Sequence, residues 1–528
     1  METSLRKEAQ VKIALPLGRV VSFATITAAG FVLGRISGIG REMVISAHFG
    51  LSSDLDAYLL AVLVPTLINN IIAGSAITAA VMPTFGRYLA EGRRDEFWRA
   101  ASTITNVVLL ITGGVTLLGM LLAAPIISLL GGDLPPATGS LATALLVIMM
   151  PTLFLGAALN MLMAVLNSLD HFVGPALIFL ALNVGMILVV IILTPYVGIY
   201  AVAWGFLAGC ALQVIIQFVE LRRENPWYSF SVDWHHPVLR QTLIAFLPIT
   251  ALALVAQINT LVDRTMATAL PAGSISALSY ADTILGSFYM LGISLGIAIF
   301  PGLSRLAAAQ DLENTARTIV ASLRILIFIL APLSLLVIPF AAPIVGVILG
   351  RGKFDATAVD MTAQAMAMYA IGLIATAALY VLQRAFYALS DNMTPFVVGL
   401  LAAGLHIGLN LVFMRSWAHA GIALSASITA IVTVVALVLL LARRVHGLQL
   451  GSLLGFLAQC AALSLACTLL ADGAFSFFRL PVGTTPTWVA GVAFAGAGGL
   501  AYLLTAMALR WPEGHMLLQT GLGFVRRK

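Results

Sequence analysis

Long apolar runs alternate with short polar or Gly/Pro-rich breaks along the whole chain. Runs such as 325–348 are almost continuous in apolar residues, and several exceed the roughly 18 residues that mark a membrane-spanning helix. Splitting the sequence at the breaks predicts fourteen helical segments, at 15–34, 55–85, 101–130, 141–167, 173–194, 198–220, 240–269, 275–304, 317–349, 357–388, 394–414, 419–442, 452–471 and 485–509. An outer-membrane barrel would instead show short strands of alternating polarity. The pattern therefore predicts an all-α polytopic membrane protein with about 14 transmembrane helices.

Composition and charge support this prediction. Of the 528 residues, 60% are hydrophobic and 9% are charged, whereas about a quarter of a soluble domain is charged. The net charge of +6 is spread over short connections, so it does not form the basic patch of a nucleic-acid-binding protein. If the N-terminus is cytoplasmic, the connections on that side, the segment ends that adjoin them and both termini hold 21 of the 28 Lys and Arg residues. The positive-inside rule then predicts that both termini are cytoplasmic.

The sequence contains an internal duplication. Pro175 and Pro395 open similar helices 220 residues apart, and Pro83 and Pro301 lie in similar stretches 218 residues apart. Six predicted spans separate the equivalents, so the two copies have the same orientation in the membrane, which is typical of transporters. We predict two parallel six-helix lobes, an N-terminal lobe at 1–222 and a C-terminal lobe at 223–446, followed by two additional helices at 447–528.

Motifs for catalysis are missing from the sequence. It contains no nucleotide-binding loop, no zinc motif and no nucleophile elbow, and no connection longer than about 20 residues could hold a soluble catalytic domain. Cys210, Cys460 and Cys467 lie in apolar segments without metal-ligand spacing. We therefore predict a transporter that is not an enzyme and that has no cofactor.

Ionisable residues inside apolar segments are costly and are therefore functional candidates. Arg35, Arg41 and Glu42 lie in a glycine-rich stretch whose glycines let helices approach closely or unwind. Arginine suits a phosphate group, because its planar fork binds two oxygens at once. The arginines are thus candidates for binding an anionic head group, and the alternative is that they reach the outer membrane interface.

Other candidates for the substrate cavity lie in the second, seventh and eighth segments. Asp56 begins the second segment, in which Asn69 and Asn70 lie near the centre, and Arg264 and Asp282 follow in the seventh and eighth. The alternative for Asp56 is a helix cap or an interfacial position, and the alternative for the two asparagines is inter-helix hydrogen bonding. Arg264 could instead belong to a structural Asp–Arg network, and Asp282 could lie only near the outer mouth of the cavity. Adjacent amides cannot face the same direction, so at most one of Asn69 and Asn70 is expected to line a cavity.

A second set of polar residues predicts a cation or proton site. Asp263 is an ionisable residue in the seventh segment, and His406 and Asn410 share a face of the eleventh. The duplication brings these segments near Ser425 and Ser427 of the twelfth. Carboxylate, amide and hydroxyl oxygens suit sodium, whereas histidine suits a proton. We predict that these five residues bind a monovalent cation or a proton, and the alternative is a hydrogen-bonded core network.

Several spaced motifs resemble one known family. They are GRISGIGREMVISAHFG, LDAYLLAVLVPTLINNIIAGSAITAAVMPTF, QINTLVDRTMATALPAGSISALSYAD, GRGKFDATAVDMTAQAM, RAFYALSDNMTP and AHAGIALSAS. Their order over roughly residues 20–445 resembles the MurJ/MviN family of bacterial lipid II flippases, in the multidrug/oligosaccharidyl-lipid/polysaccharide exporter superfamily. Arg35, Arg41, Glu42 and Asp56 match functional positions of that family, whereas Asn69, Asn70 and Thr283 stand where its members usually carry arginine.

The resemblance implies a function and a location. It implies two lobes around a cavity that opens alternately to either side of the bacterial inner membrane, with the additional helices forming a groove for a lipid tail. The implied substrate is lipid II, an undecaprenyl-pyrophosphate-linked peptidoglycan precursor, and a monomer associated with cell-wall synthesis machinery and membrane lipid is expected. Because two arginines are replaced, the alternatives are a flippase for another polyprenyl-linked glycan and a cation-coupled antiporter of small molecules. A membrane-embedded glycosyltransferase should carry a carboxylate-rich loop outside the bilayer, and none is evident in the sequence. A non-transporting scaffold for cell-wall synthesis would not require Asp263, His406 and Asn410 within the bilayer.

Overall fold

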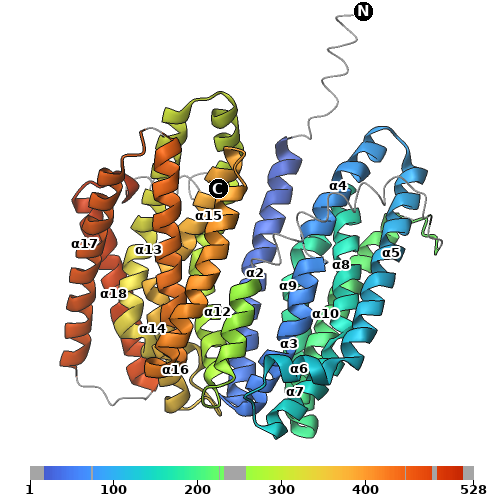
Figure 1. The fold of residues 1–528 in the computed structure, drawn as a ribbon, viewed down its shortest axis with the longest axis horizontal. Coiled ribbons are helices and arrows are strands. Elements are labelled where there is room, and N and C mark those ends of the chain that lie inside the picture. The colour runs from blue at the N-terminus through green and yellow to red at the C-terminus, as the bar shows by residue number, and fades with distance from the viewer. Residues whose placement is uncertain are drawn as a thin grey trace, which may run out of the picture. The chain divides into compact units, whose positions relative to one another are not determined.

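The computed structural model describes residues 17–72, 75–224, 226–230, 233, 257–445, 447–478 and 485–514 (Figure 1). In these ranges the regular structure is helical, without β-strands. Ten of the described helices are long and apolar enough to cross a membrane, or up to eleven if the bent pair α14 (Ala356–Ile371) and α15 (Leu373–Ala388) is one span. The all-α polytopic fold is confirmed, whereas the number fourteen stays a prediction. Both chain ends and the first part of the predicted segment 240–269 lie outside the described residues.

One helical element covers two predicted segments. α16 (Met393–Arg444) has 52 residues, but Ala418 inside it has φ 46° and ψ −128°, which is not helical. The chain therefore turns at Ala418 between the predicted segments 394–414 and 419–442. A Cβ atom on Gly421 would lie 2.3 Å from the carbonyl oxygen of Phe413, so this turn requires a glycine at 421.

Packing divides the chain into two compact units. Unit 1 consists of the described parts of Met1–Ile45, Leu60–Leu129 and Pro136–Leu254, and unit 2 consists of those of Ser46–Leu59, Leu130–Pro135 and Val255–Lys528. The division expected at residues 222 and 446 rests on the repeat rather than on packing, so those domain boundaries stay a prediction.

Unit 1 is a bundle around an aromatic core. Phe85, Phe97 and Trp98 are buried in it, and their rings meet edge to face, an arrangement that adds to the stabilisation from burial. The elements that supply unit 1 are α2 (Leu17–Phe49), α3 (Ser53–Ile72), α4 (Ser75–Ala90), α5 (Arg94–Leu121), α6 (Ala123–Leu130), α7 (Pro136–Met149), α8 (Pro151–Ser168), α9 (Val173–Val197), α10 (Tyr200–Leu221) and η1 (Arg222–Glu224).

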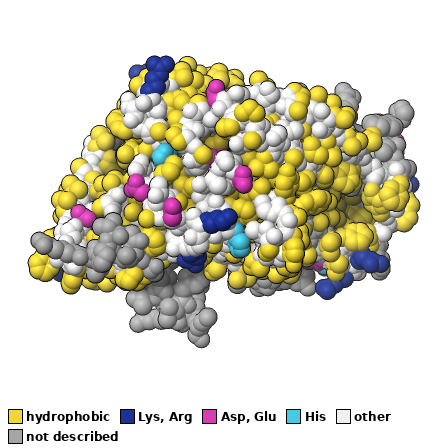
Figure 2. All heavy atoms as spheres, turned by 90° about the horizontal axis from the view of Figure 1, so that it is seen from below, with side chains coloured by type: hydrophobic (Ala, Val, Ile, Leu, Met, Phe, Trp, Pro, Cys, Tyr) yellow, Lys and Arg dark blue, Asp and Glu magenta, His cyan; other side chains and the backbone are white. Residues whose placement is uncertain are grey.

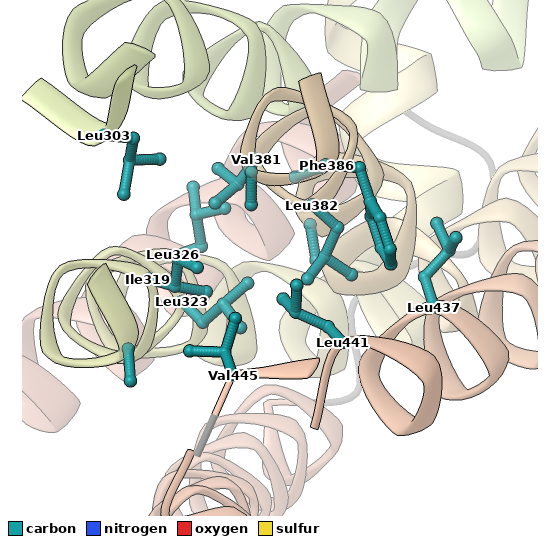
Figure 3. Close-up of a cluster of buried hydrophobic side chains, with 14 of the residues drawn as sticks. Leu303, Ile319, Leu323, Leu326, Val381, Leu382, Phe386, Leu437, Leu441 and Val445 are labelled. Carbon is teal, nitrogen blue, oxygen red and sulfur yellow. The ribbon is translucent and has the colours of Figure 1, made fainter. Parts of the chain in front are cut away.

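Unit 2 has a core of aliphatic side chains. Leu326 of α13 (Leu312–Leu349), Leu382 of α15 and Leu441 of α16 are buried together in it (Figure 3). α17 (Leu450–Phe477) and α18 (Thr485–Ala508) pack on α13 through a separate cluster that includes Phe328 and Tyr502. Besides these helices and α14, unit 2 contains α12 (Ser274–Ala308) and a described helical stretch at 257–267.

The duplication is visible in the turns that end equivalent helices. Asp170 after α8 has φ 60°, and Ser390 after α15 has φ 59°, so both are left-handed residues 220 positions apart. Each turn is closed by the same backbone hydrogen bond across five residues. These bonds run from His171 N–H to the Leu166 carbonyl, 2.9 Å, and from Asp391 N–H to the Phe386 carbonyl, 3.0 Å.

A second pair of turns repeats with the offset of 218. Gly92 after α4 has φ 72°, and Gln310 after α12 has φ 56°. Arg93 N–H donates to the Tyr88 carbonyl at 2.9 Å, and Asp311 N–H donates to the Leu306 carbonyl at 3.0 Å. Local chain geometry therefore agrees with the repeat at both predicted offsets.

Large apolar side chains are exposed on the described surface. Leu121, Leu129 and Phe477 are each more than 80% exposed, and Figure 2 shows hydrophobic side chains over much of the face that it presents. Apolar exposure on this scale is unusual for a soluble monomer. It matches the lipid-facing surface expected of membrane-spanning helices.

Candidate substrate and cation sites

Arg41 is held by a carboxylate and an amide within unit 1. Its Nε donates to Glu42 Oε1 at 3.2 Å, and its Nη2 forms an ion pair with the same oxygen. Its Nη1 donates to Oδ1 of Asn183 on α9 at 3.1 Å. The side chains of Arg41 and Glu42 are 24% and 17% exposed. The pairing offsets the cost of placing a guanidinium inside an apolar bundle.

The glycines of α2 allow this helix to lie directly against α9. A Cβ atom on Gly34 would come within 2.6 Å of Phe179 Cβ, and one on Gly38 within 3.4 Å of Asn183 Nδ2. α2 is continuous over this stretch. Of the two predicted roles of these glycines, close approach therefore applies and unwinding does not.

Arg35 lies apart from Arg41 on the same helix. Six residues turn an α-helix through about 600°, which places the two side chains on different faces, and Arg35 is exposed. The structure therefore brings Arg41 and Glu42 together and leaves Arg35 outside this pair.

Asp56 of α3 lies in unit 2 and caps α12. Its Oδ2 accepts from the Gly273 backbone N–H at 2.6 Å, and its Oδ1 accepts from the Ser276 backbone N–H at 2.8 Å and from the Ser276 hydroxyl. Asp56 is only 4% exposed. Carboxylates stabilise helix N-termini because the N–H groups there lack partners within the helix. The structure thus gives Asp56 an anchoring role, and substrate binding by Asp56 stays a prediction.

The two asparagines of α3 point in different directions. Asn70 is exposed, whereas Asn69 is half-buried and faces α8, where a Cβ atom on Gly156 would lie 2.5 Å from Asn69 Oδ1. Asn69 therefore lies against the backbone of α8. Only Asn70 presents its amide outward.

Three of the five predicted cation or proton ligands meet in unit 2. His406 Nε2 lies 2.6 Å from Asp263 Oδ1, and Asn410 Nδ2 donates to the same oxygen at 2.8 Å. His406 and Asn410 are 1% and 0% exposed. Within the described part of the chain, Asn410 Oδ1 is buried without a hydrogen-bond partner. Asp263 and His406 thus form a hydrogen-bonded acid–base pair, in which the His406 side chain is buried and the Asp263 side chain is 19% exposed.

The two predicted serines hydrogen-bond to the backbone instead. Ser425 Oγ donates to the Gly421 carbonyl at 2.9 Å. Ser427 Oγ donates to the Met368 carbonyl at 2.7 Å and accepts from the Gly372 N–H at 3.1 Å. Both hydroxyls therefore hydrogen-bond to backbone groups rather than to Asp263 or His406.

Thr429 also reaches the pair, although no sequence motif pointed to it. Its Oγ1 lies 3.4 Å from His406 Nδ1. Thr429 follows Ser425 by four residues, one helical turn, so helical spacing from Ser425 could have added it to the predicted set. Around the pair, the described residues hold no group of three or more His, Cys, Asp or Glu side chains arranged for a metal ion.

Arg264 and Asp282 have other partners. Arg264 Nη1 donates to the Ile275 carbonyl in the first turn of α12 at 2.9 Å. Asp282 is exposed and accepts from the Tyr289 hydroxyl. A pocket of about 1040 Å³ elsewhere in unit 2 is lined by Arg317, Arg324 and Glu513 among others, and none of the predicted site residues line it.

Comparison with known proteins identifies the family. A family model described as Lipid II flippase MurJ matches residues 45–494. The chain belongs to the MurJ family. Relatives include the lipid II flippase MurJ of Burkholderia cenocepacia, 28% identical over 77% of this chain and 81% of that protein. The probable lipid II flippase MurJ of Bdellovibrio bacteriovorus is 28% identical over 83% of this chain and 84% of that protein.

Solved structures show the same fold. An inward closed conformation of the lipid II flippase MurJ matches with a TM-score of 0.75 and 21% identity, over 92% of this chain and 99% of that chain. An inward-facing MATE family transporter of the MOP superfamily matches with a TM-score of 0.67 and 12% identity, over 79% and 95%. The predicted MurJ resemblance is confirmed, and the chain is a multi-pass protein of a bacterial inner membrane.

Proposed function

We propose that this chain is a flippase that moves lipid II across the cytoplasmic membrane by alternating access. Membership of the MurJ family over 450 residues carries this proposal. A charged disaccharide pyrophosphate cannot cross about 30 Å of hydrocarbon unaided. The protein supplies a polar path for the head group while the undecaprenyl chain stays in lipid. We place both termini in the cytoplasm, as the distribution of Lys and Arg indicates.

Arg41 is the residue that we assign to the pyrophosphate. It is a half-buried cation whose guanidinium is fixed on two sides, by Glu42 and Asn183. Two oxygens of a phosphate match the spacing of two guanidinium N–H groups, and this geometry is not available to lysine. Arg41→Ala is expected to abolish transport, and Arg41→Lys to restore it in part.

The test is growth of bacteria depleted of their own lipid II flippase. The intact chain should restore growth, Arg41→Ala should not, and Arg351→Ala should behave as the intact chain because Arg351 is exposed on a turn. Protein abundance in the membrane is measured in parallel. Failure of the abundant intact chain to restore growth would contradict lipid II as substrate. The same assay in cells that lack a flippase for another polyprenyl-linked glycan, or that are challenged with cationic drugs, then examines the alternatives raised by Asn69, Asn70 and Thr283.

We further propose that a proton bound at Asp263 and His406 couples transport to an ion gradient. Asp263 Oδ1, one of the oxygens that could bind sodium, is already hydrogen-bonded to His406 Nε2 and Asn410 Nδ2. The Thr429 hydroxyl can accept from a protonated Nδ1 or donate to a neutral one, so it can serve both charge states. Tyr369 lies within electrostatic reach of both Asp263 and Arg264.

Transport by purified protein in vesicles tests the coupling. Flipping of lipid II should respond to an imposed pH gradient and not to a sodium gradient. His406→Gln keeps a hydrogen-bond donor but does not titrate, and it should remove the response. His419→Gln is the matched control, because His419 is also a buried histidine, lies beyond the turn at Ala418 and contacts the Met361 carbonyl instead of Asp263. An unchanged pH response in His406→Gln would exclude His406 as the proton site.

A further inference from the structure

We propose that Asn183 is the positioning residue for Arg41, and that its amide sets the direction in which the guanidinium meets the substrate's pyrophosphate. The inference rests on the proposed contact between Arg41 and the pyrophosphate. Asn183 lies on α9, 142 residues from Arg41 in the chain, and is only 4% exposed. No motif around Arg41 contains it.

The orientation of the Asn183 amide is determined by its own partners. Nδ2 donates to the Gly34 carbonyl and to the Ser37 hydroxyl, both at 3.0 Å. A backbone carbonyl only accepts hydrogen bonds, so the nitrogen end of the amide must face Gly34. Oδ1 consequently faces Arg41, whose Nη1 donates to it at 3.1 Å. A flipped amide would place donors against the guanidinium and an oxygen against the carbonyl.

The packing of α2 on α9 keeps this geometry rigid. A Cβ atom on Gly30 would lie 2.3 Å from the Ala176 carbonyl oxygen, and one on Gly34 would lie 2.6 Å from Phe179 Cβ. Gly30, Gly34 and Gly38 follow each other at intervals of four residues, so they form one stripe along the face of α2 that lies on α9. The two backbones are therefore as close as glycine permits, and Asn183 stays in register with Arg41.

Asn183 and Glu42 act on different sides of the guanidinium. Glu42 takes the side that carries Nε and Nη2, whereas Asn183 takes Nη1. Glu42 adjoins Arg41 in sequence and moves with it. Asn183 belongs to another helix, and its amide oxygen ties the guanidinium to α9, where Nη1 also contacts Met186 Sδ at 4.0 Å. Because a two-oxygen contact depends on that plane, loss of Asn183 should weaken pyrophosphate binding even though Arg41 keeps its charge.

The experiment measures the affinity of the purified full-length protein for lipid II. Asn183→Leu has a similar volume and lacks the amide, and we expect about tenfold weaker binding, which corresponds to ~1.4 kcal/mol and is typical of one hydrogen bond to a charged group. Binding of undecaprenol, which has no phosphate, should not change. In protein that already carries Arg41→Ala, Asn183→Leu should cause no further loss of affinity for lipid II.

Gln213→Leu is the matched control. Gln213 is a buried amide of α10 that donates to the Ile178 carbonyl on α9 at 2.9 Å, so its loss also removes a bond to α9. Gln213→Leu should leave the affinity for lipid II unchanged. If Asn183→Leu does not reach the membrane, Asn183→Ala removes the same contact and leaves space for water.

Two results would overturn the inference and differ in what they imply. If Asn183→Leu lowers the affinity for lipid II equally in the presence and absence of Arg41, Asn183 acts only through packing. Unchanged binding of lipid II by Arg41→Ala would overturn the proposed role of Arg41 as well. A loss that occurs only with Arg41 present, for lipid II and not for undecaprenol, supports Asn183 as the positioning residue.

Discussion

Replacing Gly34 by alanine tests the link between helix packing and the Arg41 site. The added methyl group would lie 2.6 Å from Phe179 Cβ, about 1 Å closer than the usual ~3.5–4.0 Å between carbon atoms. Both atoms are fixed to their backbones, so no side-chain rotation relieves the contact. α2 and α9 must therefore move apart locally.

The size of the effect follows from a comparison with Gly114→Ala. Gly114 lies inside α5, and a Cβ atom there would meet nothing within 4 Å. Both substitutions share the gain of up to about 1 kcal/mol that alanine brings to a helix. Only Gly34→Ala adds overpacking, which typically costs about 1–3 kcal/mol. We therefore expect the free energy of unfolding of Gly34→Ala to be about 1–3 kcal/mol lower than that of Gly114→Ala.

The effect on transport should be larger than the effect on stability. A separation of about 1 Å would lengthen the 3.1 Å contact between Arg41 Nη1 and Asn183 Oδ1 beyond hydrogen-bonding distance. Denaturant unfolding in detergent measures the stability, and growth of flippase-depleted cells measures the function. Gly34→Ala should impair growth, and Gly114→Ala should not.

A second substitution tests whether the contact with Phe179 is the cause. Phe179→Gly removes the atom that the new methyl group meets, so the double variant should recover function in part. Stability and growth of Gly34→Ala equal to those of Gly114→Ala would refute the packing argument. A double variant with no more function than Gly34→Ala would show that the loss arises elsewhere.

Two further predictions concern stability. Asp56→Ala should lower the free energy of unfolding by at least ~2 kcal/mol, because it leaves the buried N–H groups of Gly273 and Ser276 without their acceptor. Asp54→Ala is the control, because Asp54 lies in the same helix turn and is exposed. Equal free energies of unfolding for the two variants would exclude the cap. Burial acts to raise the pKa of Asp391, but hydrogen bonds from Thr394 and the charge of Arg444 outweigh it, so the pKa is lowered. The ionised Asp391 side chain should therefore stabilise the folded state fully at pH values above its pKa in the unfolded chain, about 3.9. This stabilisation should disappear as the pH falls through the lower pKa of the folded state. Denaturant unfolding of the intact chain and Asp391→Ala from pH 7 to pH 2 should show their difference shrinking in that window, and a constant difference would contradict this assignment.

The fold was predictable because the bilayer imposes long apolar helices. The predicted segments at 173–194 and 198–220 correspond closely to α9 and α10, and the repeat correctly located equivalent turns at Asp170 and Ser390. The side chain that a polar residue contacts was harder to predict. Asn183 meets Arg41 from 142 residues away, a distance over which helical spacing carries no information.

The predicted serine ligands show a second limit of sequence reasoning. Ser425 and Ser427 were selected for their hydroxyl oxygens and their place in the repeat. A hydroxyl inside a helix can hydrogen-bond to a backbone carbonyl one turn earlier, and Ser425 does so with Gly421. Composition and spacing identify which oxygens are available along a segment, but they do not reveal which of them the backbone already uses.

The buried charges of both units share one physical feature that bears on transport. Arg41 pairs with Glu42, Asp263 pairs with His406, and Asp56 caps α12. An unpaired charge would be costly inside an apolar bundle, so each group needs a partner when no substrate or extra proton is bound. If Arg41 binds the pyrophosphate as proposed, the head group must compete with Glu42, which weakens its net binding and favours its release. A flippase requires release on the far side of the membrane as much as it requires binding. Under this proposal, Glu42 keeps Arg41 paired before the head group arrives and displaces the head group when it leaves.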